Sequence, residues 1–174
     1  MGMTRPLAWF PGVCIVVAAL SLGPSFAHVL EAVPRLTVWP PELWRQATVF
    51  HAQFEWFAVA GATFDTSVIP LLAILAFLLR RERYSFRLAV AATFFYAAAL
   101  ATWFAWVGPA NAILATWKPG PVPADFFAVR DRWETGHMVV AGLKFLGFLV
   151  LIAATLNAGR SRPGTADRAR ADQS

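Results

Sequence analysis

Four apolar stretches, each long enough to cross a lipid bilayer, constrain the fold of this chain more than any other feature. A helix needs about 20 residues to span a hydrocarbon core of about 30 Å. The stretches cover residues 7–30, 48–79, 86–107 and 137–156. The last helix is expected to begin before the lipid, over residues 125–156, because Asp125 is suited to cap its first turn. With 58% hydrophobic and 14% charged residues, the composition is also typical of a membrane protein.

We therefore predict an all-α fold: an integral membrane, four-helix up-and-down bundle over residues 1–157. Residues 158–174 are polar and rich in arginine, which predicts a disordered, basic cytoplasmic tail. The net charge of +5 sits in the segments that flank the apolar stretches and forms no continuous stripe. The expected partner is consequently the lipid bilayer, and no nucleic acid is expected.

The positions of the arginines predict how the bundle is oriented. Basic residues are denser on the cytoplasmic side of membrane proteins. In this chain they gather before the first stretch, between the second and third, and after the fourth: Arg5, Arg80, Arg81, Arg83, Arg87, Arg160, Arg162, Arg168 and Arg170. Both termini are therefore expected in the cytoplasm, with the protein in a bacterial inner membrane. The N-terminal segment leaves one alternative open, because Arg5, an apolar run and Ser25-Phe26-Ala27 also resemble a cleavable signal peptide.

Each of the three histidines has a glutamate within one helical turn. The pairs are His28 with Glu31, His51 with Glu55, and Glu134 with His137. Counting about 1.5 Å per residue from the cytoplasmic arginines places His28, Glu55, Asn111 and His137 about 35–38 Å away, at the outer interface. Ionisable groups are costly near lipid, so groups that converge at one depth indicate a functional site.

Helical spacing defines the faces that carry these groups. Residues three, four and seven apart share one face of a helix. The face of the second helix carries His51, Glu55, Ala58, Ala62 and Asp65, and that of the fourth carries Arg130, Glu134, His137, Ala141 and Lys144. Asp65 and Lys144 fall deeper, at similar depths, which predicts an ion pair between the two helices. The pair either fixes the register of the helices or relays protons below the outer site.

Three interpretations of the outer cluster follow from its residue types. His28, Glu55 and His137 are a hypothetical set of ligands for a single metal ion, since imidazole and carboxylate suit several transition metals. Alternatively, a His/Glu pair acts without a metal as a proton acceptor for an apolar aromatic substrate. In the third interpretation, the polar groups only hold the helices together.

Aromatic and basic residues surround the expected site. Trp56, Trp106, Trp117 and Trp133 lie near the outer interface, where they would anchor the bundle or contact an aromatic substrate. The connection before the last helix is long and rich in proline, as binding loops often are. Arg130 lies one turn from Glu134, which it would orient, or it would bind a polar group of a substrate.

The Gly-Pro-Ala-Asn111 segment, Trp117, and the run Arg130-Asp-Arg-Trp133-Glu134-Thr-Gly-His137 resemble the Asn…Trp…Arg-x-x-Trp…His pattern of the anthrone oxygenase-like family. The segment from His28 to Pro34 is similar to the end of the first helix in some bacterial members. These are small four-helix membrane proteins, catalogued mostly as a domain of unknown function. The resemblance implies oxidation of polycyclic anthrones to anthraquinones without a conventional organic cofactor, with Asn111, Trp117, Arg130, Trp133 and His137 lining the site.

The leading hypothesis is therefore a membrane oxidoreductase of this type, acting on a hydrophobic aromatic molecule at the outer membrane interface, with a single metal ion or none. Its predicted catalytic residues are His28, Glu31, Glu55, Asn111, Arg130, Glu134 and His137. The alternative is a non-catalytic membrane protein, such as an assembly factor, an accessory subunit or a small carrier, in which the His/Glu cluster is structural.

Overall fold

Four long apolar helices dominate the structure, a computed structural model that describes residues 8–51 and 55–160. They are α1 (Phe10–Thr37), α3 (Glu55–Leu79), a third helix over Arg83–Leu114 and α6 (Phe126–Arg160). The third helix consists of α4 (Arg83–Thr102), the π-helical turn η3 (Trp103–Val107) and α5 (Gly108–Leu114). The short α2 (Pro41–Arg45) and η2 (Gln46–Phe50) follow α1. All regular secondary structure within the described ranges is helical, and the four long helices are long and apolar enough to cross a membrane.

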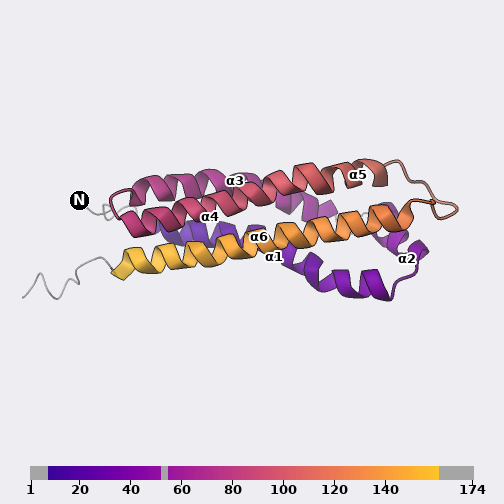
Figure 1. Ribbon diagram of the computed structural model, residues 1–174, viewed down its shortest axis with the longest axis horizontal. Helices are drawn as coiled ribbons and strands as arrows, with labels where there is room; N and C mark the ends of the chain where they lie inside the picture. The colour runs from indigo at the N-terminus through magenta and orange to yellow at the C-terminus, as the bar shows by residue number, and fades with distance from the viewer. Residues whose placement is uncertain (1–7, 52–54, 161–174) are drawn as a thin grey trace, which may run out of the picture.

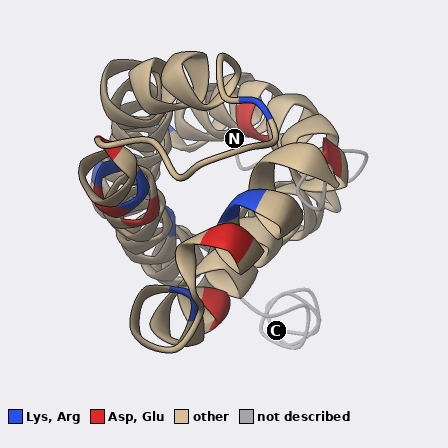
Figure 2. Ribbon diagram, turned by 90° about the vertical axis from the view of Figure 1, so that its right-hand side faces the viewer, with Lys and Arg blue, Asp and Glu red and all other residues tan. Residues whose placement is uncertain are grey.

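The long helices pack in a ring, as Figures 1 and 2 show along and down the bundle. Both α1 and α4 pack against α3 and against α6. Small residues face these contacts, which lets the helix backbones approach closely. On α1 they are Cys14, Ala18, Ser21 and Ser25, and on α4 they are Ala89, Ala92 and Ala99. The Tyr96 hydroxyl donates a hydrogen bond to the Ala18 carbonyl (3.0 Å) and so joins α4 to α1 within the core.

Several helix ends differ from the sequence-based expectation. The first helix was expected to end at residue 30, yet α1 continues through Pro34 to Thr37. The helix expected over 48–79 is interrupted at His51, which follows η2 in a non-helical conformation, and α3 covers Glu55–Leu79. The third helix extends past 107 to Leu114, and α6 extends to Arg160, three residues into the predicted tail. Two of the extensions run through a proline or a π-helical turn, because a helix can continue through them with local changes in its hydrogen bonding: α1 through Pro34, and the third helix through η3 and Pro109. The remaining tail prediction, and Arg5, Arg162, Arg168 and Arg170, lie outside the described residues.

Gly147 lies at a close contact between α6 and α4. A Cβ atom at this position would lie 3.0 Å from both the Phe95 Cβ and the Tyr96 ring. Changing Gly147 to leucine is therefore expected to destabilise the bundle by about 1–3 kcal/mol through overpacking. The matched control is Gly142→Leu on the same helix, where nothing lies within 4 Å of a built Cβ. Unfolding in detergent would compare the two variants, and equal stability would contradict this account of the α4–α6 contact.

Candidate functional site

A cavity of about 660 Å³ lies inside the ring of helices, in the half of the bundle nearest α2 and α5. All four long helices contribute to its wall. Of the residues singled out from the sequence, seven line it: His28, Glu55, Asp65, Asn111, Trp133, His137 and Lys144. The cavity is thus the place where the predicted convergence of polar side chains occurs. Trp103, Phe57 and Phe104, which the sequence analysis did not single out, also line it.

The two histidines that line the cavity are in direct contact. The ring centroids of His28 on α1 and His137 on α6 lie 4.2 Å apart, with an angle of 16° between the ring planes. The Trp133 ring packs edge-on against both, at 4.4 Å from His137 and 5.1 Å from His28. Phe57 of α3 contacts His28 from another side at 5.5 Å. Stacking and edge contacts therefore fix the imidazoles within an aromatic wall.

Asn111 and Trp133 form a polar contact at the same wall. The Trp133 indole N–H donates a hydrogen bond of 2.7 Å to the Asn111 side-chain oxygen. Because this oxygen is engaged, the amide presents its NH₂ group as a donor. The contact joins α5 to α6 beside the histidine pair. Asn111 and Trp133, which both belong to the sequence pattern that resembles the anthrone oxygenase-like family, are therefore hydrogen-bonded to each other.

The predicted ion pair between α3 and α6 is confirmed. Lys144 Nζ donates to both carboxylate oxygens of Asp65, at 2.7 and 2.8 Å. It also donates to the Ser25 hydroxyl (2.9 Å) and the Ser21 carbonyl (3.2 Å), while the Ser21 hydroxyl donates to Asp65 (2.6 Å). The network joins three helices at the deep end of the cavity. Pairing offsets part of the cost of placing these charges at membrane depth.

A second buried ion pair lies behind the histidines and was missed from the sequence. Arg35 Nε and the Trp44 indole N–H both donate to the same oxygen of Glu134, each at 2.7 Å. Arg35 also donates to the Thr48 hydroxyl at 2.6 Å and lies 3.9 Å from Glu31. Its guanidinium carbon lies 5.3–5.4 Å from the ring centroids of three tryptophans: Trp39, Trp44 and Trp133. We call Arg35, Trp44 and Glu134 the Arg35 cluster.

Several predicted site residues lie elsewhere. Glu134 belongs to the Arg35 cluster and is 1% exposed. Arg130 was expected to orient Glu134, but Arg35 does so instead. Arg130 instead pairs with the neighbouring Asp131 at 2.8 Å. Trp56 is 78% exposed, whereas Trp117 packs against Trp44 and Phe126. Glu31 is partly exposed beside Arg35, and His51 is exposed at the end of η2.

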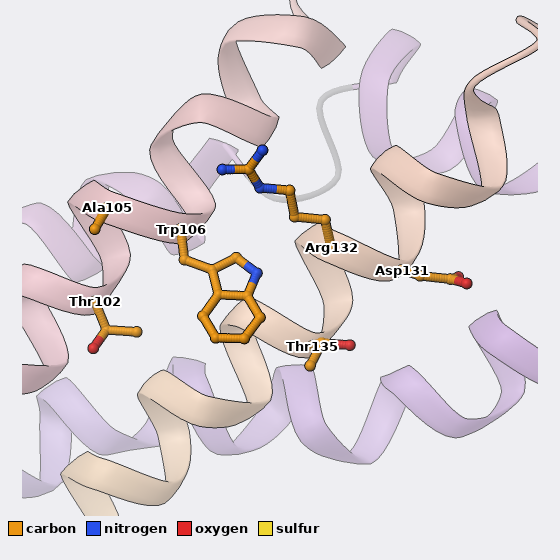
Figure 3. Close-up of a pocket in the computed structure, with 6 residues that line it drawn as sticks. All are labelled: Thr102, Ala105, Trp106, Asp131, Arg132 and Thr135. Atoms are coloured by element: carbon orange, nitrogen blue, oxygen red, sulfur yellow. The ribbon is translucent and has the colours of Figure 1, made fainter.

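Trp106 lines a different, open groove on the outside of the bundle. Figure 3 shows this groove between the third helix and α6, with the Trp106 ring on one side and Arg132 on the other. Trp106 also packs close to Gly136, where an added Cβ would lie 3.1 Å from the indole. Trp106 therefore helps to join η3 to α6 and is absent from the wall of the central cavity.

The hypothetical metal ligands His28, Glu55 and His137 all line the cavity. Within residues 8–51 and 55–160, however, no three His, Cys, Asp or Glu side chains are grouped closely enough to hold a metal ion. The stacked imidazoles therefore lack a third ligand of this kind among the described residues. Acid-base chemistry needs only the histidines and is compatible with this arrangement.

Comparisons of the chain with protein-family models, with curated proteins and with solved structures found no match.

Proposed function

We propose that this protein is a membrane oxidoreductase, similar to the anthrone oxygenase-like family, that oxidises a hydrophobic aromatic molecule. The observation that carries the proposal is the stacked pair of His28 and His137 on the wall of a largely apolar cavity. Its volume of about 660 Å³ falls in the range of about 300–1,000 Å³ that small-molecule sites occupy. Trp103, Trp133 and Phe57 offer ring faces and edges to a flat substrate.

The proposed reaction replaces a CH₂ group between two aromatic rings by a carbonyl, with dioxygen as co-substrate. His137 removes one proton from the CH₂ group, and the resulting carbanion forms a C–O bond with dioxygen. After protonation to a hydroperoxide, loss of the second C–H proton and cleavage of the O–O bond release water. The balance is R₂CH₂ + O₂ → R₂C=O + H₂O, so the substrate supplies all the electrons. Asn111 donates a hydrogen bond from its NH₂ group to a substrate carbonyl, which stabilises the negative charge as it forms.

The proposal includes an orientation in the membrane. Arg80, Arg81, Arg83 and Arg87 lie at the connection between α3 and α4, and Arg160 ends α6. The positive-inside rule then supports an up-and-down bundle with both termini in the cytoplasm of a bacterium. The histidine pair would lie toward the outer interface of the inner membrane, at the end of the bundle that also holds Trp39, Trp44 and Trp117.

Replacing His137 with alanine is expected to lower the rate of anthrone oxidation about 10²–10⁴-fold, because the proton acceptor is removed. The rate would be followed as anthraquinone formation and oxygen consumption by the protein in lipid vesicles. His51→Ala is the matched control, since His51 is an exposed histidine at the end of η2. Full activity in the His137→Ala protein would overturn the proposal.

A non-catalytic role is the second candidate, and it is favoured by the two buried ion pairs, Asp65–Lys144 and Arg35–Glu134. These charges neutralise each other and serve to hold the helices in place. The protein would then be an assembly factor, an accessory subunit or a small carrier. Absence of oxidation by the unmodified protein, together with a partner that co-purifies at constant stoichiometry, would favour this role.

A further inference from the structure

One stripe of α3 both lines the cavity and is exposed. Its residues are Glu55, Ala58, Ala62 and Thr66, spaced three or four apart along the helix. Among the described elements, α3 packs against α1 and α4 and makes no comparable contact with η3 or α5. Together with the exposure of the stripe, this indicates that the cavity opens between α3 and η3. Gly61 lies beside the stripe, and a Cβ built there would meet only Asp65, at 4.0 Å. Small side chains thus leave space along three turns of α3.

The opposite edge of the opening belongs to η3. Trp103 and Phe104 line the cavity, yet Phe104 is 65% exposed. Since η3 packs against α4, α5 and α6, its aromatic side chains face α3 across the cavity. A π-helical turn at this point is notable because such turns occur frequently at functional sites. We call the opening bounded by Ala58, Ala62 and Thr66 on α3 and by Trp103 and Phe104 on η3 the lateral slot.

The depth of the slot indicates what lies outside it. At about 1.5 Å per residue, Ala62 lies about 27 Å and Thr66 about 21 Å from Arg80, and Phe104 lies about 26 Å from Arg87. With one edge of a hydrocarbon core of about 30 Å near these arginines, all three residues face lipid chains. The edge is also apolar in character, because the Thr66 hydroxyl donates to the Ala62 carbonyl of its own helix (2.6 Å).

We infer that the lateral slot is the entrance through which an uncharged, flat aromatic molecule dissolved in the lipid reaches the cavity from the leaflet opposite the arginine-rich connection. The inference rests on the proposed function and adds to it the route and the class of ligand. A lipid-soluble molecule is already concentrated in the bilayer and meets small side chains on one edge and aromatic rings on the other. Lys144 and Asp65 at the deep end are paired, so they do not attract a charged ligand from the lipid.

The test uses single cysteines at matched depth in lipid vesicles. Ala62→Cys lies in the slot, and Gly142→Cys, also about 27 Å from its arginine, lies on the exposed face of α6. The native Cys14 is fully buried. Each protein is treated with lipid-soluble N-phenylmaleimide or with a charged, water-soluble methanethiosulfonate, with and without anthracene, and modification is assigned by mass spectrometry. Energy transfer from tryptophan to anthracene measures binding without any need for activity.

We expect N-phenylmaleimide to modify both cysteines and the charged reagent to modify neither. Anthracene at about ten times its Kd should slow the reaction of Ala62→Cys about tenfold and leave Gly142→Cys unchanged. Thr66→Cys, one turn away on the same stripe and about 21 Å from Arg80, is the second variant should Ala62→Cys not fold. Reaction of the slot cysteine with the charged reagent, equal protection at both positions, or no binding of anthracene would each overturn the inference.

Oxidation of anthrone, measured in the same vesicles, separates the two proposals. If anthracene protects Ala62→Cys selectively but the protein does not oxidise anthrone, the lateral slot is supported and the oxidoreductase proposal is contradicted. If the protein oxidises anthrone but anthracene does not protect Ala62→Cys selectively, the oxidoreductase proposal is supported and the lateral slot is contradicted.

Discussion

Replacing Arg35 with methionine is expected to destabilise the protein by about 3–5 kcal/mol, because it leaves the Glu134 carboxylate buried without its ion-pair partner. Both side chains are at most 1% exposed, so water does not replace the lost contact. Trp44 would keep its hydrogen bond to Glu134, but a single neutral donor does not balance a buried charge. The free energy of unfolding in mixed detergent micelles, followed by tryptophan fluorescence, is the measurement.

Arg130→Met is the control for this prediction. Arg130 pairs with Asp131, whose side chain is 56% exposed, so water can solvate this carboxylate when the arginine is removed, and the expected loss is only about 0–1 kcal/mol. The double variant Arg35→Met, Glu134→Leu should recover much of the lost stability, since no charge then remains unpaired. A similar, small loss in Arg35→Met and Arg130→Met would show that the Arg35 cluster does not stabilise the bundle.

The second large effect is expected at Lys144. Changing Lys144 to methionine removes the cation that contacts both oxygens of Asp65, at 2.7 and 2.8 Å, and leaves a carboxylate at membrane depth. Among the residues that the structure describes, the Ser21 hydroxyl then remains as a donor to it. The expected loss is again about 3–5 kcal/mol in the free energy of unfolding.

A double variant distinguishes a structural ion pair from a proton relay. Lys144→Met, Asp65→Leu carries no charge at this depth and should regain stability. If the pair only fixes the register of α3 and α6, this variant oxidises anthrone at nearly the normal rate. A stable but inactive double variant would instead assign proton transfer to the pair.

Much of the bundle and part of the site were predictable because both depend on periodicity. Uninterrupted apolar length predicts a membrane helix, and each of the four long helices contains most of one predicted stretch. Helical spacing and depth also predicted that His28 and His137 lie at one level and that Asp65 pairs with Lys144. The structure confirms both predictions. These predictions need only a straight helix and a common reference at the cytoplasmic arginines.

The Arg35 cluster escaped prediction because it depends on where helices end. The first helix was expected to end at residue 30, which leaves Pro34 and Arg35 outside it, whereas α1 includes both residues. Trp44 lies outside the four predicted stretches, yet it is fully buried against Glu134 and Phe126. One signal was available: Arg35 follows Glu31 by four residues, a spacing that places the two on one helical face.

The Trp106 prediction shows a different limit. Its sequence position is near the outer interface, as expected, but position along the chain does not determine which side of a helix a residue occupies across a π-helical turn. Within the wider turn of η3, residues three apart no longer share one face as they do in an α-helix. Trp103 lines the cavity, while Trp106 lies in the outer groove.

The Arg35–Glu134 bond joins residues that are 99 positions apart, from the first long helix to the last. During synthesis, α1 enters the membrane long before the ribosome has produced Glu134 or Lys144. Until α6 arrives, Arg35 lacks Glu134 and Asp65 lacks Lys144, so each of the two buried ion pairs is missing one of its members. Synthesis of the last helix therefore supplies the residues that complete both buried ion pairs.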